Sequence, residues 1–250
     1  MTGNPSTWRY AASGRPVFTD MEIEDEAYTF LHAYDKTLLT EPSFPPVAGF
    51  LEYLRKSYGV NVIVTDLGQR NGLVVVGKVV FSTNTICVSE DIIADQQAFA
   101  STVGHEIGHW VLHRHRPIRI EDRQLIEESD DNEITVLGPR RSNTKNRTTR
   151  DWMEHQAKVF SGALLMPVDA FRVAVVSAQK HLGVTRNLGR VRRDYQGSSE
   201  RDLQSLIAIL QQVYGLSKEA IRVRLLGTGI IQSSTKIGNI LGDMLDRRFS

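Results

Sequence analysis

The chain has 250 residues, enough for one large domain or two modest ones, and its apolar and charged fractions of 41% and 24% are those of an ordinary globular protein. A formal net charge of +1 argues against general binding of the whole chain to nucleic acid or to a membrane surface. The single cysteine, Cys87, excludes an internal disulfide, and no segment has the apolar length of a signal peptide or a membrane span. The expected location is therefore the cytoplasm.

The first part of the chain predicts a loose leader and two helices. Residues 1–18 are polar, and Thr19 followed by Glu22 has the pattern of a capping box that opens a helix. Apolar residues then recur at helical spacing, at Ile23, Ala27, Phe30, Leu31, Tyr34 and Leu38. The prolines of EPSFPPV (41–47) end this helix, and a second short helix is expected over 48–57.

From Gly59 the pattern changes to that of β structure. VNVIVTDL, GLVVVGKVVFS and TICVSE are rich in β-branched residues, and Arg70-Asn71-Gly72 is a tight-turn signal. These segments predict a small, mostly antiparallel sheet of three or four strands over 60–90. Cys87, which alternates with apolar neighbours, is interpreted as a small buried hydrophobic residue and not as a reactive thiol.

The remaining chain predicts helices separated by one long insertion. A helix is expected over 94–113, and another over 151–166 that Pro167 ends. The insertion at 116–150 is first acidic and then basic, and its second part is expected to be a mobile surface loop. We therefore expect a leader at 1–18, one domain at 19–167, and an α-helical region at 168–250.

The helix expected over 94–113 carries the motif His105-Glu106-Ile107-Gly108-His109. Two histidines four residues apart lie on one helix face about 6 Å apart, so both imidazoles can bind one metal ion. The intervening glutamate is then placed to deprotonate water at the metal. The competing interpretation is a solvated helix face with no metal. Gly104 and Gly108 each weaken the helix by up to about 1 kcal/mol, which suggests that something packs closely there or that a substrate strand must approach the helix.

A zinc enzyme of this kind needs a third protein ligand. His113 is about 12 Å along the helix axis from His105, so it cannot share their ion and is expected to support or pack beside the site. Glu154 is favoured because a helix places a ligand more rigidly than a loop does, and small residues follow it. The other candidates remain open: Glu121, Glu127, Glu128, Asp130, Asp131, Glu133, Asp151 and His155.

HEIGHWVLH and, after the insertion, EHQAKVFSGALLMP resemble the two motifs of the ImmA/IrrE family of zinc metallopeptidases. The resemblance covers roughly residues 20–170 and implies zinc held by His105, His109 and Glu154, with Glu106 as general base. It also implies a protein substrate, commonly a helix-turn-helix transcriptional repressor cut under stress or during induction of a mobile element. Gln156 departs from the family pattern, in which a second acidic residue is common at this position. The insertion at 116–150 is longer than the compact connections of the resembled family.

The region 203–231 has the pattern of two helices joined by a short turn, with Gly215 as the break and Ser217 as an N-cap. Residues 180–250 carry 12 Lys or Arg against 6 Asp or Glu, and Arg222 and Arg224 are candidates for a DNA-contacting stripe. GLSKEAIRVRL also matches a segment that packs beside the peptidase domain in the resembled family. For this segment, packing beside the peptidase domain or docking of a protein substrate is favoured over contact with DNA.

We therefore predict an α+β fold in which a small sheet packs with an HExxH helix and a second ligand-bearing helix. The predicted function is a zinc-dependent endopeptidase acting on a regulatory protein such as a repressor. One alternative is a non-catalytic, zinc-containing transcriptional regulator that binds DNA or a repressor, and a second is a zinc hydrolase that acts on something other than a peptide. The sequence does not indicate an oligomeric state.

Overall fold

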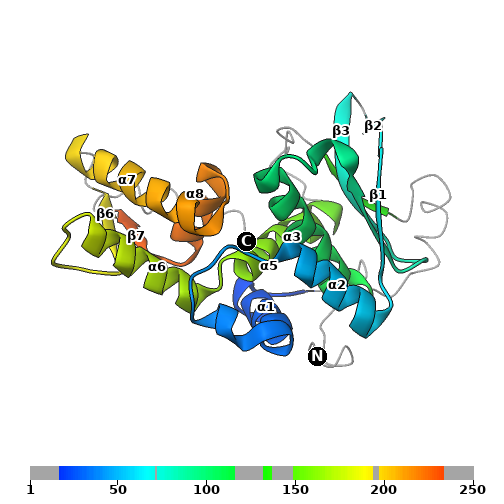
Figure 1. The fold of residues 1–250 in the computed structure, drawn as a ribbon, viewed down its shortest axis with the longest axis horizontal. Helices are drawn as coiled ribbons and strands as arrows, with labels where there is room; N and C mark the ends of the chain where they lie inside the picture. The colour runs from blue at the N-terminus through cyan, green and yellow to red at the C-terminus, as the bar shows by residue number, and fades with distance from the viewer. Residues whose placement is uncertain (1–16, 71, 116–131, 137–148, 194–196, 234–250) are drawn as a thin grey trace. The chain divides into compact units, whose positions relative to one another are not determined.

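The computed structural model describes residues 17–70, 72–115, 132–136, 149–193 and 197–233. The chain divides into two compact units, one formed by Met1–Lys36 with Pro45–Leu165 and the other by Thr37–Phe44 with Met166–Ser250 (Figure 1). The first unit contains a sheet and the HExxH helix, and the second is mainly helical. The fold is therefore α+β, as the sequence predicts.

Two helices open the first unit. Helix α1 (Asp20–Asp35) begins at the predicted capping box, in which the Thr19 side chain accepts from the Glu22 amide at 3.2 Å and Glu22 Oε2 accepts from the Thr19 amide at 2.7 Å. A short 3-10 helix, η2 (Lys36–Leu39), follows it. Helix α2 (Val47–Tyr58) ends at Gly59, whose φ of 63° is the left-handed conformation that glycine adopts without strain.

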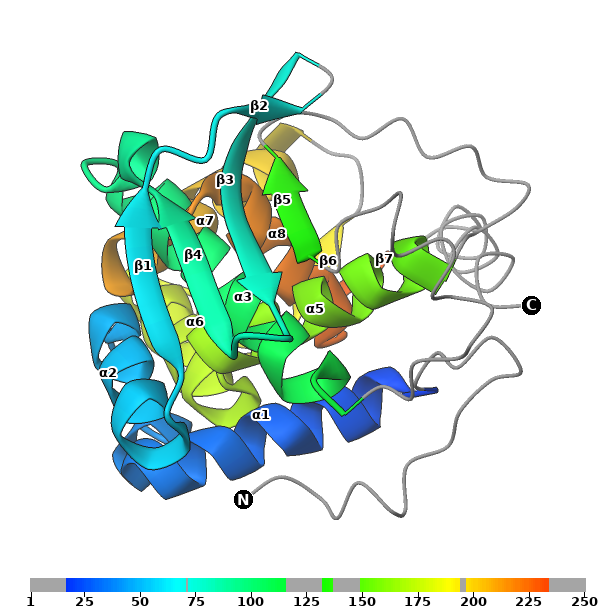
Figure 2. The same cartoon turned by 90° about the vertical axis from the view of Figure 1, so that its right-hand side faces the viewer.

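The sheet lies in the first unit, with β4 and β3 at its centre (Figure 2). Its strands are β1 (Asn61–Thr65), β2 (Gln69–Arg70), β3 (Leu73–Val80), β4 (Thr85–Ser89) and β5 (Asn132–Val136). Strand β3 pairs antiparallel with β2, β4 and β5, whereas β1 pairs parallel with β4. Arg70 pairs with Leu73, on either side of the predicted tight turn, of which Asn71 lies outside the described residues.

The expectation of a mostly antiparallel sheet with up to four strands over 60–90 is confirmed, and two features of the sheet go beyond it. Because β1 pairs with β4 and not with the strand that follows it, the two run parallel and the sheet is mixed. The fifth strand, β5, lies in the insertion at 116–150, where the sequence predicts no strand. Only Ile134, Thr135 and Val136 are β-branched in this strand, and the residues before them are polar, so the run is too short to predict a strand.

Helix α3 (Gln96–His113) carries the motif and runs through the core of the first unit, after the short 3-10 helix η3 (Glu90–Ile92). It starts two residues later than predicted, because Asp95 accepts from the amides of Gln97 and Ala98 at 3.0 Å and caps it. Every residue from 102 to 113 is buried, since α3 packs against β3 and β4 and against helix α5 (Thr149–Leu165). The ligand-bearing residues therefore lie in the protein interior.

Among its described residues, the second unit contains most of η2, three α-helices and a small sheet. The helices are α6 (Val168–His181), α7 (Gly197–Tyr214) and α8 (Lys218–Gly227). The predicted turn between α7 and α8 is present: Gly215 has a φ of 62°, and the Ser217 side chain caps α8 by accepting from the Ala220 amide. The region is not purely helical, because β6 (Val191–Arg193) and β7 (Ile231–Ser233) form a parallel pair that the sequence analysis did not predict.

In the part of the chain that the structure describes, no single helix has the length and apolar character needed to cross a membrane. Among the described residues, only 150–165 and 168–181, taken together as one broken span, meet that criterion of length and apolar character. The large apolar side chains of these two helices include buried ones, such as Phe160 and Phe171.

Candidate active site

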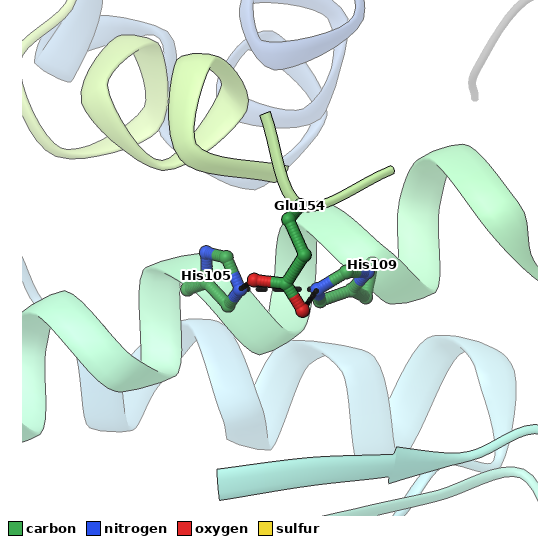
Figure 3. Close-up of side chains that lie close together, drawn as sticks. All are labelled: His105, His109 and Glu154. Atoms are coloured by element: carbon green, nitrogen blue, oxygen red, sulfur yellow. Dashed lines mark hydrogen bonds and ion pairs between the residues drawn. The ribbon is translucent and has the colours of Figure 1, made fainter. Parts of the chain in front are cut away.

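The two motif histidines lie one helical turn apart on α3 and face the same point (Figure 3). The Nε2 atoms of His105 and His109 are 3.0 Å apart, and both side chains are buried. Two imidazole nitrogens at this separation can bind a single metal ion. A solvated helix face, the competing interpretation of the motif, is therefore wrong.

The third group comes from α5. Glu154 Oε2 lies 3.4 Å from His105 Nε2, and Glu154 Oε1 lies 3.8 Å from His109 Nε2 (Figure 3). The structure thus brings His105, His109 and Glu154 together, with ligand atoms all within 4.8 Å of one another. The carboxylate is buried like the two imidazoles.

The donor set can be tested against the geometry of zinc. Ligand atoms about 2 Å from a tetrahedrally coordinated zinc ion lie about 3.3 Å from one another. The two Nε2 atoms, 3.0 Å apart, and the approaches of the two Glu154 oxygens, Oε2 at 3.4 Å from His105 and Oε1 at 3.8 Å from His109, are close to this value. Two imidazole nitrogens and a carboxylate oxygen are also the ligands of a common type of catalytic zinc site. The residues present therefore fit a zinc ion.

The glycines of the motif allow α5 to approach α3. A Cβ atom at Gly108 would lie 2.9 Å from the Ala157 carbonyl oxygen and 3.1 Å from its Cα. A Cβ at Gly104 would lie 2.7 Å from Ser161 Oγ. Close packing against these glycines, which the sequence predicts, is confirmed, and it holds the helix that carries Glu154 against the histidine helix.

Glu106 is completely buried and lies against strand β3. A Cβ atom at Gly77 would lie 2.5 Å from Glu106 Oε1 and 2.7 Å from Thr102 Cγ2. Gly77 therefore provides the space that the carboxylate occupies. In the sequence this glycine stands inside the β-branched segment GLVVVGKVVFS. A glycine inside a β-branched strand often marks such a close approach, and that signal identifies Gly77 as part of the site.

His113 does not join the three ligands but lies behind one of them. Its Nδ1 is 3.1 Å from His109 Nδ1, and its Nε2 is 3.1 Å from Gln156 Oε1 on α5. All three side chains are buried. The structure therefore places His113 in the supporting position that its distance from His105 predicts.

The other candidates for a third ligand do not reach this cluster where the structure describes them. Asp151 is exposed, and His155 Nε2 lies 3.7 Å from Asp20 Oδ1 on α1. Glu133 lies in β5 and its side chain is outside the described atoms. The remaining acidic candidates, Glu121, Glu127, Glu128, Asp130 and Asp131, fall outside the described residues.

The end of α3 is fixed by Asn84 and Arg114. Asn84 has a φ of 51° and accepts from Trp110 Nε1 at 2.8 Å, while its amide donates to the carbonyls of Tyr58 and Gly59 at 3.1 Å. The Arg114 guanidinium lies 4.2 Å from the centre of the Trp110 ring and donates to the Trp110 and Val111 carbonyls. These contacts join α2, the β3–β4 turn and the C-terminal end of α3. They therefore hold in place the end of the helix that carries His105 and His109.

In the second unit, the two arginines proposed for a DNA-contacting stripe are engaged within the protein. Arg224 is buried and its Nε donates to the Met166 carbonyl at 2.8 Å. Arg222 lies 3.7 Å from Glu200 on α7. The exposed side chains of α8 include Lys218, Glu219, Val223 and Leu226, which are mixed in charge and partly apolar.

The buried histidine pair, the adjacent glutamate and the carboxylate from a second helix define a protein with a metallopeptidase-type site. The family model described as the IrrE N-terminal-like domain matches residues 55–226, so the chain belongs to the Peptidase_M78 family. The match includes both α3 and α5, and the family expected from the two motifs is confirmed. No match was found among curated proteins.

Proposed function

We propose that this protein is a zinc-dependent endopeptidase that cleaves a regulatory protein, such as a helix-turn-helix transcriptional repressor, in the cytoplasm. The observation that carries the proposal is the convergence of His105, His109 and Glu154 beside a buried Glu106 in a chain of the Peptidase_M78 family. His105, His109 and Glu154 would hold the zinc ion. The repressor as substrate class rests on the resemblance of the two motifs to the ImmA/IrrE family.

Bound zinc would supply Lewis acidity, which polarises the scissile carbonyl and makes water nucleophilic at neutral pH. Glu106 follows a ligand directly in the sequence, and its buried carboxylate is held against β3 at Gly77. We assign it the role of general base: it accepts a proton from the attacking water and delivers that proton to the leaving amine. The buried setting strengthens the electrostatic interactions of this carboxylate.

An extended peptide is the substrate conformation that this architecture favours. The scissile peptide has to lie along the ligand face of α3, next to a sheet whose strands can pair with an added chain. The mixed and partly apolar surface of α8 is better suited to docking a protein substrate than to tracking a phosphate backbone. These observations favour the peptidase over the alternative of a DNA-binding regulator.

The test compares cells that express the wild-type protein with cells that express Glu106→Gln, by mass spectrometry of newly formed protein N-termini. The proposal predicts cleavage products in the wild type, including products of a helix-turn-helix regulator, that are missing in the variant. Zinc content should be the same in both proteins, because Glu106 is not a ligand. Identical sets of N-termini in the two cultures would refute the peptidase and favour the non-catalytic alternative.

A further inference from the structure

A row of three buried side chains, His109, His113 and Gln156, extends from a candidate metal ligand on α3 to α5. His109 Nδ1 lies 3.1 Å from His113 Nδ1, and His113 Nε2 lies 3.1 Å from Gln156 Oε1. We propose that Gln156 is a positioning residue that, through His113, fixes the tautomer and orientation of His109. The inference concerns the zinc site of the proposed function, but it does not depend on whether the protein cleaves anything.

The chemistry of the three groups sets the direction of both hydrogen bonds. An amide oxygen can only accept, so His113 must donate from Nε2 to Gln156. A neutral His113 then carries a lone pair on Nδ1, which accepts a hydrogen bond from Nδ1–H of His109. With its proton on Nδ1, His109 has a lone pair on Nε2, the atom that faces His105 and Glu154. The acceptor at position 156 therefore favours the tautomer of His109 in which Nε2 can bind a metal.

Placement on two helices makes this row rigid. The histidines follow one another at intervals of four residues on α3, and Gln156 lies two residues after Glu154 on α5. The same helix thus supplies a metal ligand and the acceptor behind another ligand. Residues that hydrogen-bond to the free nitrogen of a ligating histidine orient the ring and raise its basicity as a ligand.

The first test measures the zinc affinity of the full-length protein by competition with a chromophoric chelator, in wild type and three variants. Gln156→Leu removes the acceptor and should weaken zinc binding by about 10- to 100-fold. Gln156→Glu retains an acceptor and should bind close to wild type. Val111→Ala removes buried apolar volume from α3 without touching the row, so it controls for general loss of stability and should also bind close to wild type. Wild-type affinity in Gln156→Leu, or an equal loss in Val111→Ala, would overturn the proposal.

The second test reads the tautomers directly, by long-range proton–nitrogen NMR of the full-length, zinc-loaded protein labelled with ¹⁵N at histidine. The proposal predicts that wild-type His113 carries its proton on Nε2, and that Gln156→Leu loses this preference. A proton on Nδ1 of His113 in the wild type would overturn it, even if Gln156→Leu fails to fold. If the wild type binds no zinc, the proposed function fails, and the same spectrum of the metal-free protein still decides the tautomer of His113.

Discussion

Replacing Gly108 by alanine tests whether close helix packing sets the position of Glu154. The added Cβ would lie 2.9 Å from the Ala157 carbonyl oxygen and 3.1 Å from its Cα, both backbone atoms of α5. Ordinary contacts of this kind begin at about 3.4 Å, so α5 has to move by about 0.5 Å. Glu154 lies on the same helix, less than one turn before Ala157, so it moves with the backbone.

Two opposing effects determine the size of the change. Alanine stabilises a helix interior by about 1 kcal/mol relative to glycine, whereas overpacking a well-packed core costs about 1 to 3 kcal/mol. We expect a net loss of stability of up to about 2 kcal/mol for Gly108→Ala. The displacement matters more for the site, because a shift of about 0.5 Å is the limit within which metal and catalytic groups must be held. Zinc affinity should fall at least about tenfold, as when the support of a ligand is removed.

Two matched glycines serve as controls in the same assays, thermal unfolding and zinc competition. At Gly104 the added methyl meets the ends of Ser161 and Leu165, which can rotate away, so zinc affinity should change much less than in Gly108→Ala. At Gly162 nothing lies within 4 Å, so alanine should raise stability by up to about 1 kcal/mol and leave zinc binding unchanged. A Gly108→Ala protein that is stabilised like Gly162→Ala and binds zinc like the wild type would refute the packing argument.

Two further predictions follow from the neighbourhood of Glu106. In Gly77→Ala the methyl would occupy the space of the carboxylate, 2.5 Å from Oε1, so substrate cleavage should fall by about 10²-fold while zinc content stays at the wild-type level; unchanged cleavage would contradict the role of this glycine. Burial, and to a smaller extent the nearby Glu106 charge, raises the pKa of the Cys87 thiol, so a thiol reagent at pH 8 should label it only after unfolding. Labelling of the native protein at the rate of a free cysteine would contradict the burial of Cys87 in β4.

The elements that the sequence predicts correctly are those with strong local signals. Thr19 and Glu22 cap α1 through contacts between residues three apart, and the interval between His105 and His109 follows from helix geometry alone. Glu154 is predictable because it lies on a regular helix with small residues one turn later. Two of those small residues, Ala157 and Ser161, pack against Gly108 and Gly104 of α3.

The features that the sequence did not reveal depend on contacts between distant segments. Strand β5 is held by its pairing with β3, about 55 residues earlier in the chain, and its own apolar run is short. The parallel pairing of β1 with β4 is likewise a property of the sheet and not of either segment. Gln156 was noted only as a departure from a family pattern, because its function depends on a hydrogen bond to His113 across two helices.

The most direct test of the central claim is the zinc content of the purified full-length protein, measured by mass spectrometry of the metal in wild type, His109→Ala and Glu154→Ala. We expect one zinc per chain in the wild type and a sharp fall in both variants, because His109 and Glu154 each supply one of three converging ligand atoms. Circular dichroism of each variant shows whether it remains folded. A folded Glu154→Ala protein with unchanged zinc and unchanged zinc affinity would contradict the account, because the third ligand would then come from another residue.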